Sequence, residues 1–377
     1  MRAKEPAFDY IRVMDDYRNF ELKSPRRRMS KKKYAAFAAA VFFISAGALI
    51  ATFAAGDWYV HQKLQKKGMY NIWGYRGPVA GPKKRGEFRI AVLGGSTALG
   101  YGAPVGQSFP AHLERMLNEK PRKGGPEFYS VVNLAWNNEG AHSFVHTLKD
   151  YAYLSYDAVI FYTGYNDLIG KNLAVFRHRS PVFKLTGYMP LLPGMMLDKA
   201  KMLRLGLSID DINMGRKRTN FSPGILDRTK AAALELGGET ARSLEKQLGR
   251  LTASGRIEAE SREEGCGKRW AFYCGEVHAA ARYALEKGAA LAVVIQPYVS
   301  DNHIAQQKTL EEMLRQRFGG EPRLAHFNLG EAVDLKDRGL AFDGIHLTSR
   351  GNEIVAKNIA AAMMDFLRKQ NRSNRSK

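Results

Sequence analysis

Cysteine is almost absent from this sequence. The 377-residue chain contains only Cys266 and Cys274, which are too few and too closely placed to supply the four ligands of a zinc ribbon. In an oxidising compartment the two thiols could form a local disulfide, whereas in a reducing one they would stay free. The sequence leaves both states open.

Acidic residues are also in short supply. The chain has 37 Asp and Glu against 58 Lys and Arg, a net charge of +21, which raises the question of a nucleic acid or another anionic partner. Much of the basic excess lies in residues 1–33 and in the C-terminal tail, and no nucleic-acid-binding motif accompanies it. We therefore predict no nucleic-acid partner and expect a solvated basic arm and tail.

Nucleotide-binding motifs are missing too. The glycine-rich segment LGGSTALGYG has neither G-x-G-x-x-G spacing nor the lysine of a P-loop, so it does not predict a nucleotide site. No internal repeat or low-complexity segment is evident. Hydrophobic residues make up 45% of the chain, which is enough for a buried core and excludes extensive disorder except at the ends.

Long apolar runs are limited to one. Residues 34–56, YAAFAAAVFFISAGALIATFAAG, carry no charge and match the ~20 residues with which a helix crosses a bilayer. A cleaved signal peptide and a buried core helix are the alternatives, but a long polar arm precedes the run, and Trp58 and Tyr59 behind it suit a membrane interface. We predict a retained single-pass anchor in the cytoplasmic (inner) membrane. The basic arm 1–33 would be cytoplasmic and the main domain periplasmic or extracellular.

The rest of the chain predicts one large α/β domain. Residues 57–86, which include RGPVAGPKKRG, are expected to be a linker, followed by a domain over 87–370 and a basic tail over 371–377. FRIAVLGG, FYSVVNLAW, YDAVIFYTG and AALAVVIQPY have the pattern of buried strands and alternate with amphipathic helical segments. Such alternation predicts a parallel sheet.

A helical insertion is expected at about residues 168–268. This stretch has no strong strand signal, and the apolar segment PVFKLTGYMPLLPGMML is followed by charged helical stretches. It could be a lid or an acyl-chain surface, even one that touches the membrane, because the anchor holds the domain close. The alternative is an extra helical layer with a small core of its own.

Two segments could form a serine-based catalytic site. Ser96 follows the first predicted strand, at the carboxyl end where open α/β sheets place their ligands. Asp343 and His346 lie close together in AFDGIHLTSRGNEIV, just before the last predicted helix. A serine hydroxyl needs a base to take its proton, and the base needs an acceptor that fixes its tautomer. We predict Ser96 as nucleophile, His346 as base and Asp343 as its partner.

Two further strand ends could stabilise an oxyanion. The third predicted strand ends in YTGYNDL, where Asn166 could donate its side-chain amide. The second leads to NLAWNNEGAHS, where Gly140 could donate a backbone N–H, with Ala135 as the alternative position. Taken alone, each segment could also be an ordinary turn.

Together these four segments resemble the SGNH hydrolase family, also called GDSL-type esterases and lipases. The resemblance covers roughly residues 88–368 and is most specific in G-Y-N-D and D-G-I-H-L-T. It implies a flavodoxin-like three-layer α/β/α sandwich, an oxyanion hole of the Ser96 and Gly140 amides with the Asn166 side chain, and no metal or organic cofactor. Gly95 stands where the name-giving motif has Asp. An α/β-hydrolase elbow fits less well, because Ala98 replaces the closing glycine of its motif.

The predicted function is hydrolysis of ester bonds through an acyl-enzyme on Ser96. Carbohydrate O-acyl esters and lipid or short-chain acyl esters are the expected substrates. The same acyl-enzyme could pass its acyl group to a sugar hydroxyl, so an O-acyltransferase that modifies a cell-envelope polysaccharide is an alternative. A non-catalytic, membrane-tethered glycan-binding protein is another, because a fold does not guarantee activity.

Overall fold

The computed structural model describes residues 30–119, 125–213, 218, 220–251 and 266–375. Most of the predicted basic arm, part of the predicted insertion and the last two residues of the tail lie outside these ranges. The chain divides into two compact units, Met1–Thr52 and Phe53–Lys377.

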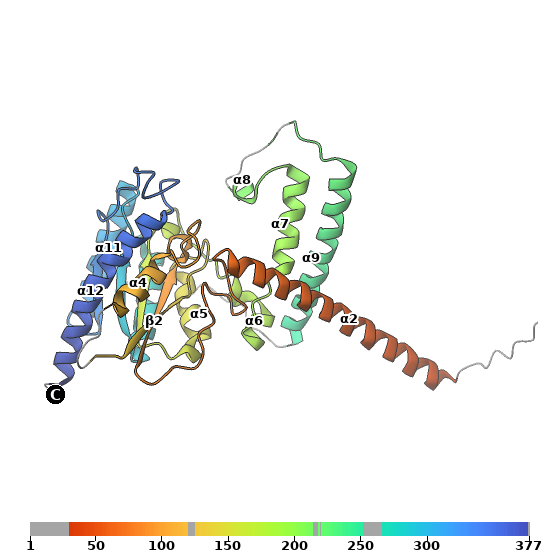
Figure 1. The fold of residues 1–377 in the computed structure, drawn as a ribbon, viewed down its shortest axis with the longest axis horizontal. Coiled ribbons are helices and arrows are strands. Elements are labelled where there is room, and N and C mark those ends of the chain that lie inside the picture. Colours follow the sequence, from red (N-terminus) through yellow and green to blue (C-terminus); the bar gives the residue numbers. More distant parts are fainter. Residues whose placement is uncertain (1–29, 120–124, 214–217, 219, 252–265, 376–377) are drawn as a thin grey trace, which may run out of the picture. The chain divides into compact units, whose positions relative to one another are not determined.

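Helix α2, Lys31–Lys66, contains the predicted apolar run (Figure 1). Among the described helices, α2 alone is long and apolar enough to cross a membrane, by length and composition. Large apolar side chains along it are exposed, for example Phe43 at 71% and Ile50 at 61%. The helix continues past the run as far as Lys66, because no glycine or proline interrupts it before Gly68.

The second unit is built on one parallel sheet of five strands in the order β2-β1-β3-β4-β5. This is the strand order of flavodoxin-like doubly wound sheets, so the predicted α/β class is confirmed. The strand bounds are β1 Glu87–Gly94, β2 Phe128–Asn133, β3 Ala158–Thr163, β4 Ala290–Ile295 and β5 Leu324–Asn328.

The register of the sheet brings the strand ends together at one edge. Every residue of β3 and β4 is buried, as expected for central parallel strands covered on both faces. Gly94 at the end of β1 pairs with Tyr162, and Thr163 at the end of β3 pairs with Ile295 at the end of β4. The segments that follow these strands therefore leave the sheet side by side.

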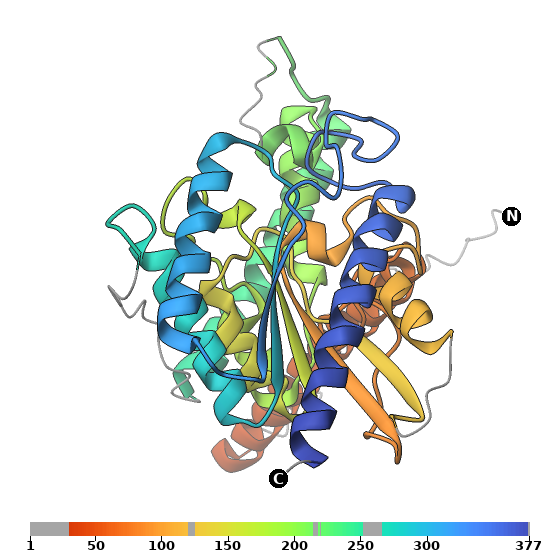
Figure 2. The ribbon, with the colours of Figure 1, turned by 90° about the vertical axis from the view of Figure 1, so that its left-hand side faces the viewer.

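Helices cover both faces of the sheet (Figure 2). Helix α4, Phe109–Asn118, packs with α12, Ser349–Arg375, on one face. Helix α5, His142–Asp150, packs with α10, Ala271–Glu286, on the other, and α11 spans Asp301–Phe318. The three layers agree with the predicted sandwich.

Strand β5 was not expected from the sequence. The four strands with long apolar runs were all predicted. In β5, four of the five residues are only partly buried and the last is exposed. A half-exposed strand at the edge of a sheet needs no apolar run. Its sequence, LAHFN, therefore gave no clear signal.

Residues 57–86, expected to be a linker, pack into the second unit. Asp57 and His61 on the last turns of α2 are buried, as are Tyr70 and Arg76 beyond it. Arg76 donates hydrogen bonds to the carbonyl oxygens of Gly100, Ala103 and Pro104. The basic, glycine- and proline-containing composition suggested solvated chain, but this guanidinium is satisfied by carbonyl groups distant in sequence.

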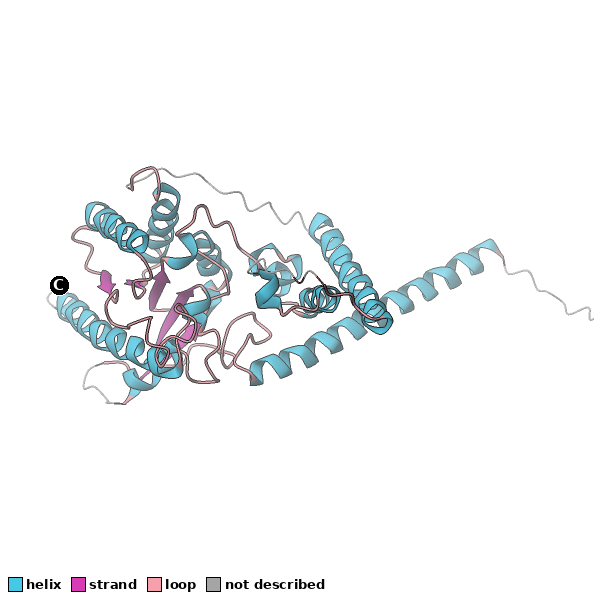
Figure 3. Ribbon diagram, turned by 90° about the horizontal axis from the view of Figure 1, so that it is seen from above, coloured by secondary structure: helices cyan, strands magenta, loops and turns pink. Residues whose placement is uncertain are grey.

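The described part of the predicted insertion is helical (Figure 3). Helix α7 packs closely against α9, because Gly238 leaves room for the Leu197 side chain. The helices of this region are α6 Pro181–Thr186, α7 Leu192–Leu205, α8 Ile209–Asn213 and α9 Ile225–Leu251.

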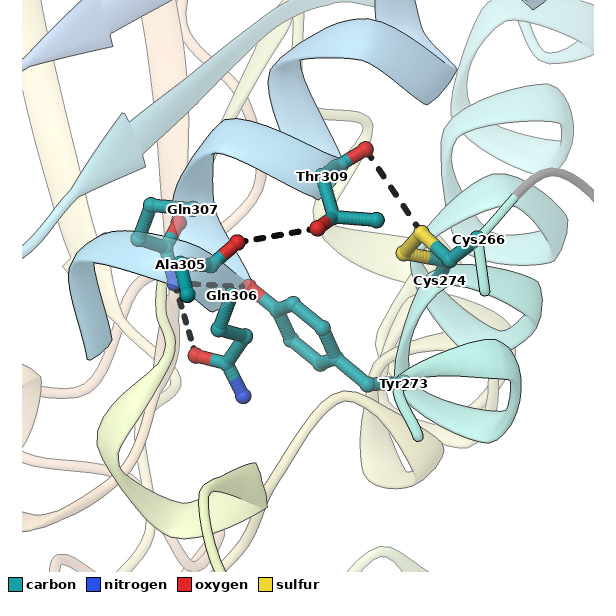
Figure 4. The surroundings of a disulfide bond; sticks show 7 residues. All are labelled: Cys266, Tyr273, Cys274, Ala305, Gln306, Gln307 and Thr309. Atoms are coloured by element: carbon teal, nitrogen blue, oxygen red, sulfur yellow. Dashed lines mark hydrogen bonds between the residues drawn. A yellow bond between two sulfur atoms is a disulfide. The ribbon is translucent and has the colours of Figure 1, made fainter. Parts of the chain in front are cut away.

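Cys266 and Cys274 form a disulfide where the chain returns from the insertion to the sheet domain (Figure 4). No described cysteine is free. Cys266 Sγ lies 3.6 Å from the Thr309 carbonyl oxygen of α11, and since a disulfide sulfur carries no proton, this is a packing contact. Of the two states that the sequence left open, the structure contains the bonded one.

Candidate functional site

Ser96 stands directly beyond the end of β1, as the first residue of the short helix α3, Ser96–Leu99. Two glycines precede it. A side chain at Gly94 would lie 2.6 Å from the Ala98 Cβ atom, and one at Gly95 would overlap the side-chain nitrogen of Asn166. The turn that leads from β1 to Ser96 therefore has no space for residues larger than glycine at positions 94 and 95.

Asp343 and His346 lie in a tight turn before α12. His346 Nδ1 is 2.7 Å from Asp343 Oδ2, while Asp343 Oδ1 accepts the backbone N–H groups of Ile345 and His346 at 3.0 and 2.7 Å. Gly344 has a φ of +85°, which glycine adopts readily. Partial burial favours a higher pKa for the Asp343 carboxyl, but the hydrogen bonds from His346 and the backbone hold that pKa below its ordinary value.

The imidazole joins this turn to Ser96. His346 Nε2 is 2.8 Å from Ser96 Oγ. With Nδ1–H donated to the Asp343 carboxylate, Nε2 is left as an acceptor for the serine proton. The structure thus brings together Ser96, His346 and Asp343 from segments 250 positions apart.

Two aromatic rings flank the imidazole. The Tyr101 ring centre is 5.0 Å from that of His346, and Phe342 is nearly parallel to the imidazole at 5.9 Å. Phe342 and Ile345 are each 39% exposed. These side chains restrict the imidazole and give the surroundings of Ser96 an apolar border.

Asn166 follows the end of β3, in the short 3-10 helix Tyr165–Asp167. Its side-chain Nδ2 donates to the Glu139 carbonyl oxygen at 2.7 Å and lies against Gly95. A primary amide carries a second N–H. A Cβ atom at position 95 would lie 2.0 Å from this nitrogen, so a larger residue there would displace the Asn166 amide.

Gly140 follows the same Glu139, beyond the end of β2. Within the described part of the chain, neither its backbone N–H nor that of Ser96 donates a hydrogen bond. The alternative position, Ala135, differs, because its N–H donates to Asn133 Oδ1 at 3.2 Å. Gly140 is therefore the better placed of the two to offer a free donor.

Gln296, immediately after β4, is a residue that the sequence interpretation missed. Its Oε1 accepts the Tyr165 backbone N–H at 2.8 Å, and its Nε2 donates to Thr97 Oγ1 at 2.6 Å. The side chain is buried and links the turn that holds Ser96 to the turn that holds Asn166. A polar residue at the end of a fully apolar strand was the available signal.

Tyr70 was also missed, because it lies in the expected linker. Its ring stacks on Trp136 with centres 3.8 Å apart, and its hydroxyl oxygen accepts the Asn137 backbone N–H at 3.1 Å. Residues 136–141, which we call the Gly140 loop, thus contact the segment that follows α2.

Two buried carboxyl groups support the Gly140 loop. Asp167 Oδ2 accepts the Ala141 N–H at 3.1 Å, and burial raises the pKa of Asp167 to about 7. Burial likewise raises the pKa of Glu139 to about 7, although the Arg177 guanidinium opposes the rise. Both groups lie next to the proposed oxyanion donors, and within the described part of the chain neither carboxyl forms a hydrogen bond with Ser96.

Metal ligands do not gather in the described ranges. No group of three or more His, Cys, Asp or Glu side chains there is arranged to hold an ion.

Comparison with known proteins found likenesses among solved structures. The sequence matched no model of a protein family and no curated protein. Among solved structures, the chain is similar to one described as a lipolytic protein of the G-D-S-L family from Desulfitobacterium hafniense DCB-2. The identity is 11%, the TM-score 0.36, and 72% of this chain and 98% of that chain are covered.

A second solved structure is that of a carbohydrate esterase whose active site is described as displaying divergent catalytic and non-catalytic binding functions. Here the identity is 11%, the TM-score 0.30, and 77% of this chain and 68% of that chain are covered. At this degree of likeness a shared activity does not follow, so the case for one rests on the residues of the site.

Proposed function

We propose that this protein is a serine esterase-type hydrolase of the SGNH kind, held at a membrane by α2. The observation that carries the proposal is the continuous series of hydrogen-bonding contacts from Asp343 through His346 to Ser96, at 2.7 and 2.8 Å. A nucleophile, a base and an acceptor that orients the base are the groups that acyl transfer to a serine requires.

In the proposed reaction, Ser96 Oγ attacks the ester carbonyl carbon while His346 Nε2 takes the serine proton. Asp343 stabilises the imidazolium that forms. The N–H groups of Ser96 and Gly140 and the Asn166 amide stabilise the oxyanion. His346 then gives its proton to the departing alcohol, which leaves an acyl-enzyme, and water activated by His346 releases the acid.

The substrate would be an acyl ester or an acylated glycan. The apolar border formed by Phe342 and Ile345 is compatible with an acyl group or with the face of a sugar ring. Transfer of the acyl group to a sugar hydroxyl of a cell-envelope polysaccharide would use the same residues, so product analysis with and without a glycan acceptor distinguishes the two outcomes.

The proposed location is the cytoplasmic membrane, with α2 as the anchor and the domain in the periplasm or outside the cell. The Cys266–Cys274 disulfide supports an oxidising compartment. Protease added outside intact spheroplasts should then cut the C-terminal domain, and a domain that stays uncut would contradict this orientation.

Turnover of p-nitrophenyl acetate and butyrate by the full-length protein tests the activity. Ser96→Ala should lower turnover by ~10³-fold or more, whereas Ser222→Ala, at an exposed serine of the insertion, should leave it unchanged. Equal turnover by both variants would exclude Ser96 as the nucleophile. A folded protein that neither hydrolyses nor transfers acyl groups would favour the non-catalytic glycan-binding alternative.

A further inference from the structure

Helix α9 has an exposed face without charged side chains. At 100° per residue, its Asp, Glu, Lys and Arg side chains leave free an arc of roughly 160° along the whole helix, and the side chains in the middle of that arc span roughly 100°. Several large apolar side chains in this arc are exposed, including Ile225 at 86%, Leu236 at 72% and Leu251 at 86%. We call this face the α9 stripe; its members are Ile225, Leu226, Thr229, Ala233, Leu236, Thr240, Ser243, Leu244, Gln247 and Leu251.

The stripe is not needed for the fold of the insertion. The residues of α9 that are buried, Ala231 and Gly238, lie on the other side of the helix, where Gly238 meets Leu197 and the Pro193 carbonyl oxygen of α7. Leucine and isoleucine side chains that stay this exposed over a 27-residue helix indicate a surface that is covered in the functional protein.

The end of the apolar run in α2 lies close to the middle of this helix. Asp57 Oδ1, one residue past the run, accepts the backbone N–H of Leu191 at 2.8 Å and that of Leu192, at the start of α7. Pro193 and Leu197, on the first turns of α7, contact Gly238 of α9. Asp57 is therefore joined to the middle of α9 through the first turns of α7.

Further contacts fix this arrangement. The Tyr188 hydroxyl donates to Asp57 Oδ2, and His61 Nε2 lies 2.8 Å from the Met189 carbonyl oxygen. Asp57 and His61 are 4% and 0% exposed. The neighbouring Trp58 and Tyr59 are exposed at 57% and 64%, and such side chains prefer the level of lipid headgroups.

We propose that the α9 stripe lies in the surface of the lipid bilayer that α2 enters, with its apolar side chains at the boundary between headgroups and acyl chains. This inference rests on the proposed membrane anchor. A lipid surface is the occupant that these contacts favour, because the end of the run must lie at that surface and α9 is attached to it. Lys230 on one border of the stripe and Arg250 on the other are placed to meet lipid phosphates, as in other interfacial helices.

Quenching by spin-labelled lipids tests the proposal in the full-length protein. Cysteines introduced by Leu236→Cys, Glu239→Cys and Ile50→Cys are labelled with bimane, one variant at a time, without reductant so that the native disulfide stays closed. The proteins are reconstituted into phosphatidylcholine and phosphatidylglycerol vesicles with and without lipid that carries a doxyl group near the headgroup. Glu239 is the matched control, since it is exposed on the same helix but outside the stripe.

The proposal expects the doxyl lipid to quench the label at position 236 by at least about 2-fold more than the label at 239, because an interfacial helix buries its apolar face in the headgroup region. Equal quenching at 236 and 239, with strong quenching at 50, overturns the proposal and leaves the anchor standing. No quenching at 50 overturns the anchor and the proposal together. A blue-shifted label at 236 that doxyl lipid does not quench identifies a protein partner, such as a second copy of the chain, and also overturns it.

Discussion

At the scale of single residues, Gln296 links the two turns on which the proposed chemistry depends. One side-chain amide accepts from Tyr165, next to Asn166, and donates to Thr97, next to Ser96. The distance between nucleophile and oxyanion donor is therefore controlled by a residue that would not touch the substrate. Gln296 is a positioning residue in this interpretation.

Replacing Gln296 by methionine keeps the volume and removes both hydrogen bonds. We expect Gln296→Met to lower kcat for p-nitrophenyl acetate by about 10- to 100-fold with little change in KM, because small displacements of catalytic groups mainly raise the barrier. The control is Gln306→Met, a buried glutamine whose side chain bonds to neither turn. If both variants lose kcat equally, Gln296 has only a structural role.

Asp167 makes stability depend on pH in a predictable direction. Its pKa is 3.8 in the reference state and about 7 in the folded protein. The folded state thus keeps a proton that the unfolded chain releases, so the stabilisation present below about pH 4 is lost as the pH rises through 7. Asp167→Asn cannot ionise but retains an oxygen that can accept the Ala141 N–H.

We therefore expect the Tm of the native protein to fall more between about pH 5 and pH 8 than the Tm of Asp167→Asn. Differential scanning fluorimetry across this range measures it. Glu139 has a similar pKa and is present in both proteins, so the difference between the two curves reports Asp167. Parallel curves would show that Asp167 is ionised in the folded state at both pH values.

Sequence motifs identified the residues proposed to react but missed the residues that hold them. Ser96, Asn166, Asp343 and His346 occur in short segments with recognisable order. Gln296 has no such segment, because its partners Tyr165 and Thr97 are 131 and 199 positions away. A role defined only by distant contacts leaves no local pattern in a single sequence.

At the scale of secondary-structure elements, burial decided what the sequence could predict. β3 and β4 are buried along their whole length and were evident as apolar runs. β5 lies at the sheet edge with partly exposed side chains and was not found. The helical nature of the insertion was predictable, whereas the pairing of α7 with α9 through glycines was not.

Substitutions at two glycines test how closely α7 packs against α9. A Cβ atom at Gly238 would lie 2.7 Å from Leu197 Cγ, whereas one at Gly194, also helical, would meet nothing within 4 Å. Gly238→Ala should destabilise the protein by about 1–3 kcal/mol through overpacking. Gly194→Ala should be neutral or stabilise it by ~0.5–1 kcal/mol. Urea titration of both variants measures this, and a neutral Gly238→Ala would show that α7 and α9 can separate without cost.

At the scale of the whole molecule, the segment after the apolar run is part of the folded domain and not a spacer. Its composition is typical of a linker, and only its contacts in three dimensions show that it folds with the domain. Asp57 accepts hydrogen bonds from the start of α7, and Tyr70 supports the Gly140 loop. A soluble fragment that begins at Lys67 would lack Asp57 and His61.

Asp57→Ala tests how much this attachment contributes to the stability of the folded protein. The substitution leaves the N–H groups of Leu191 and Leu192 without their acceptor, which should cost about 1–2 kcal/mol, as for other lost helix caps. Gln62→Ala, at an exposed position of the same helix, is the control and should change little. Denaturant titration in detergent, followed by tryptophan fluorescence, compares the two midpoints. Equal midpoints would mean that Asp57 contributes nothing to holding α7.

The attachment of α2 to the insertion also sets an order of events during synthesis. Apart from His61, the partners of Asp57 follow it by 131 to 135 positions. At about 5–20 residues per second, translation reaches them roughly 7–27 seconds after Asp57 has been made. Through that interval, His61 and water are the partners open to the carboxylate. With α2 as the proposed anchor, the nascent chain would enter the membrane well before the segment that secures the domain to α2 exists.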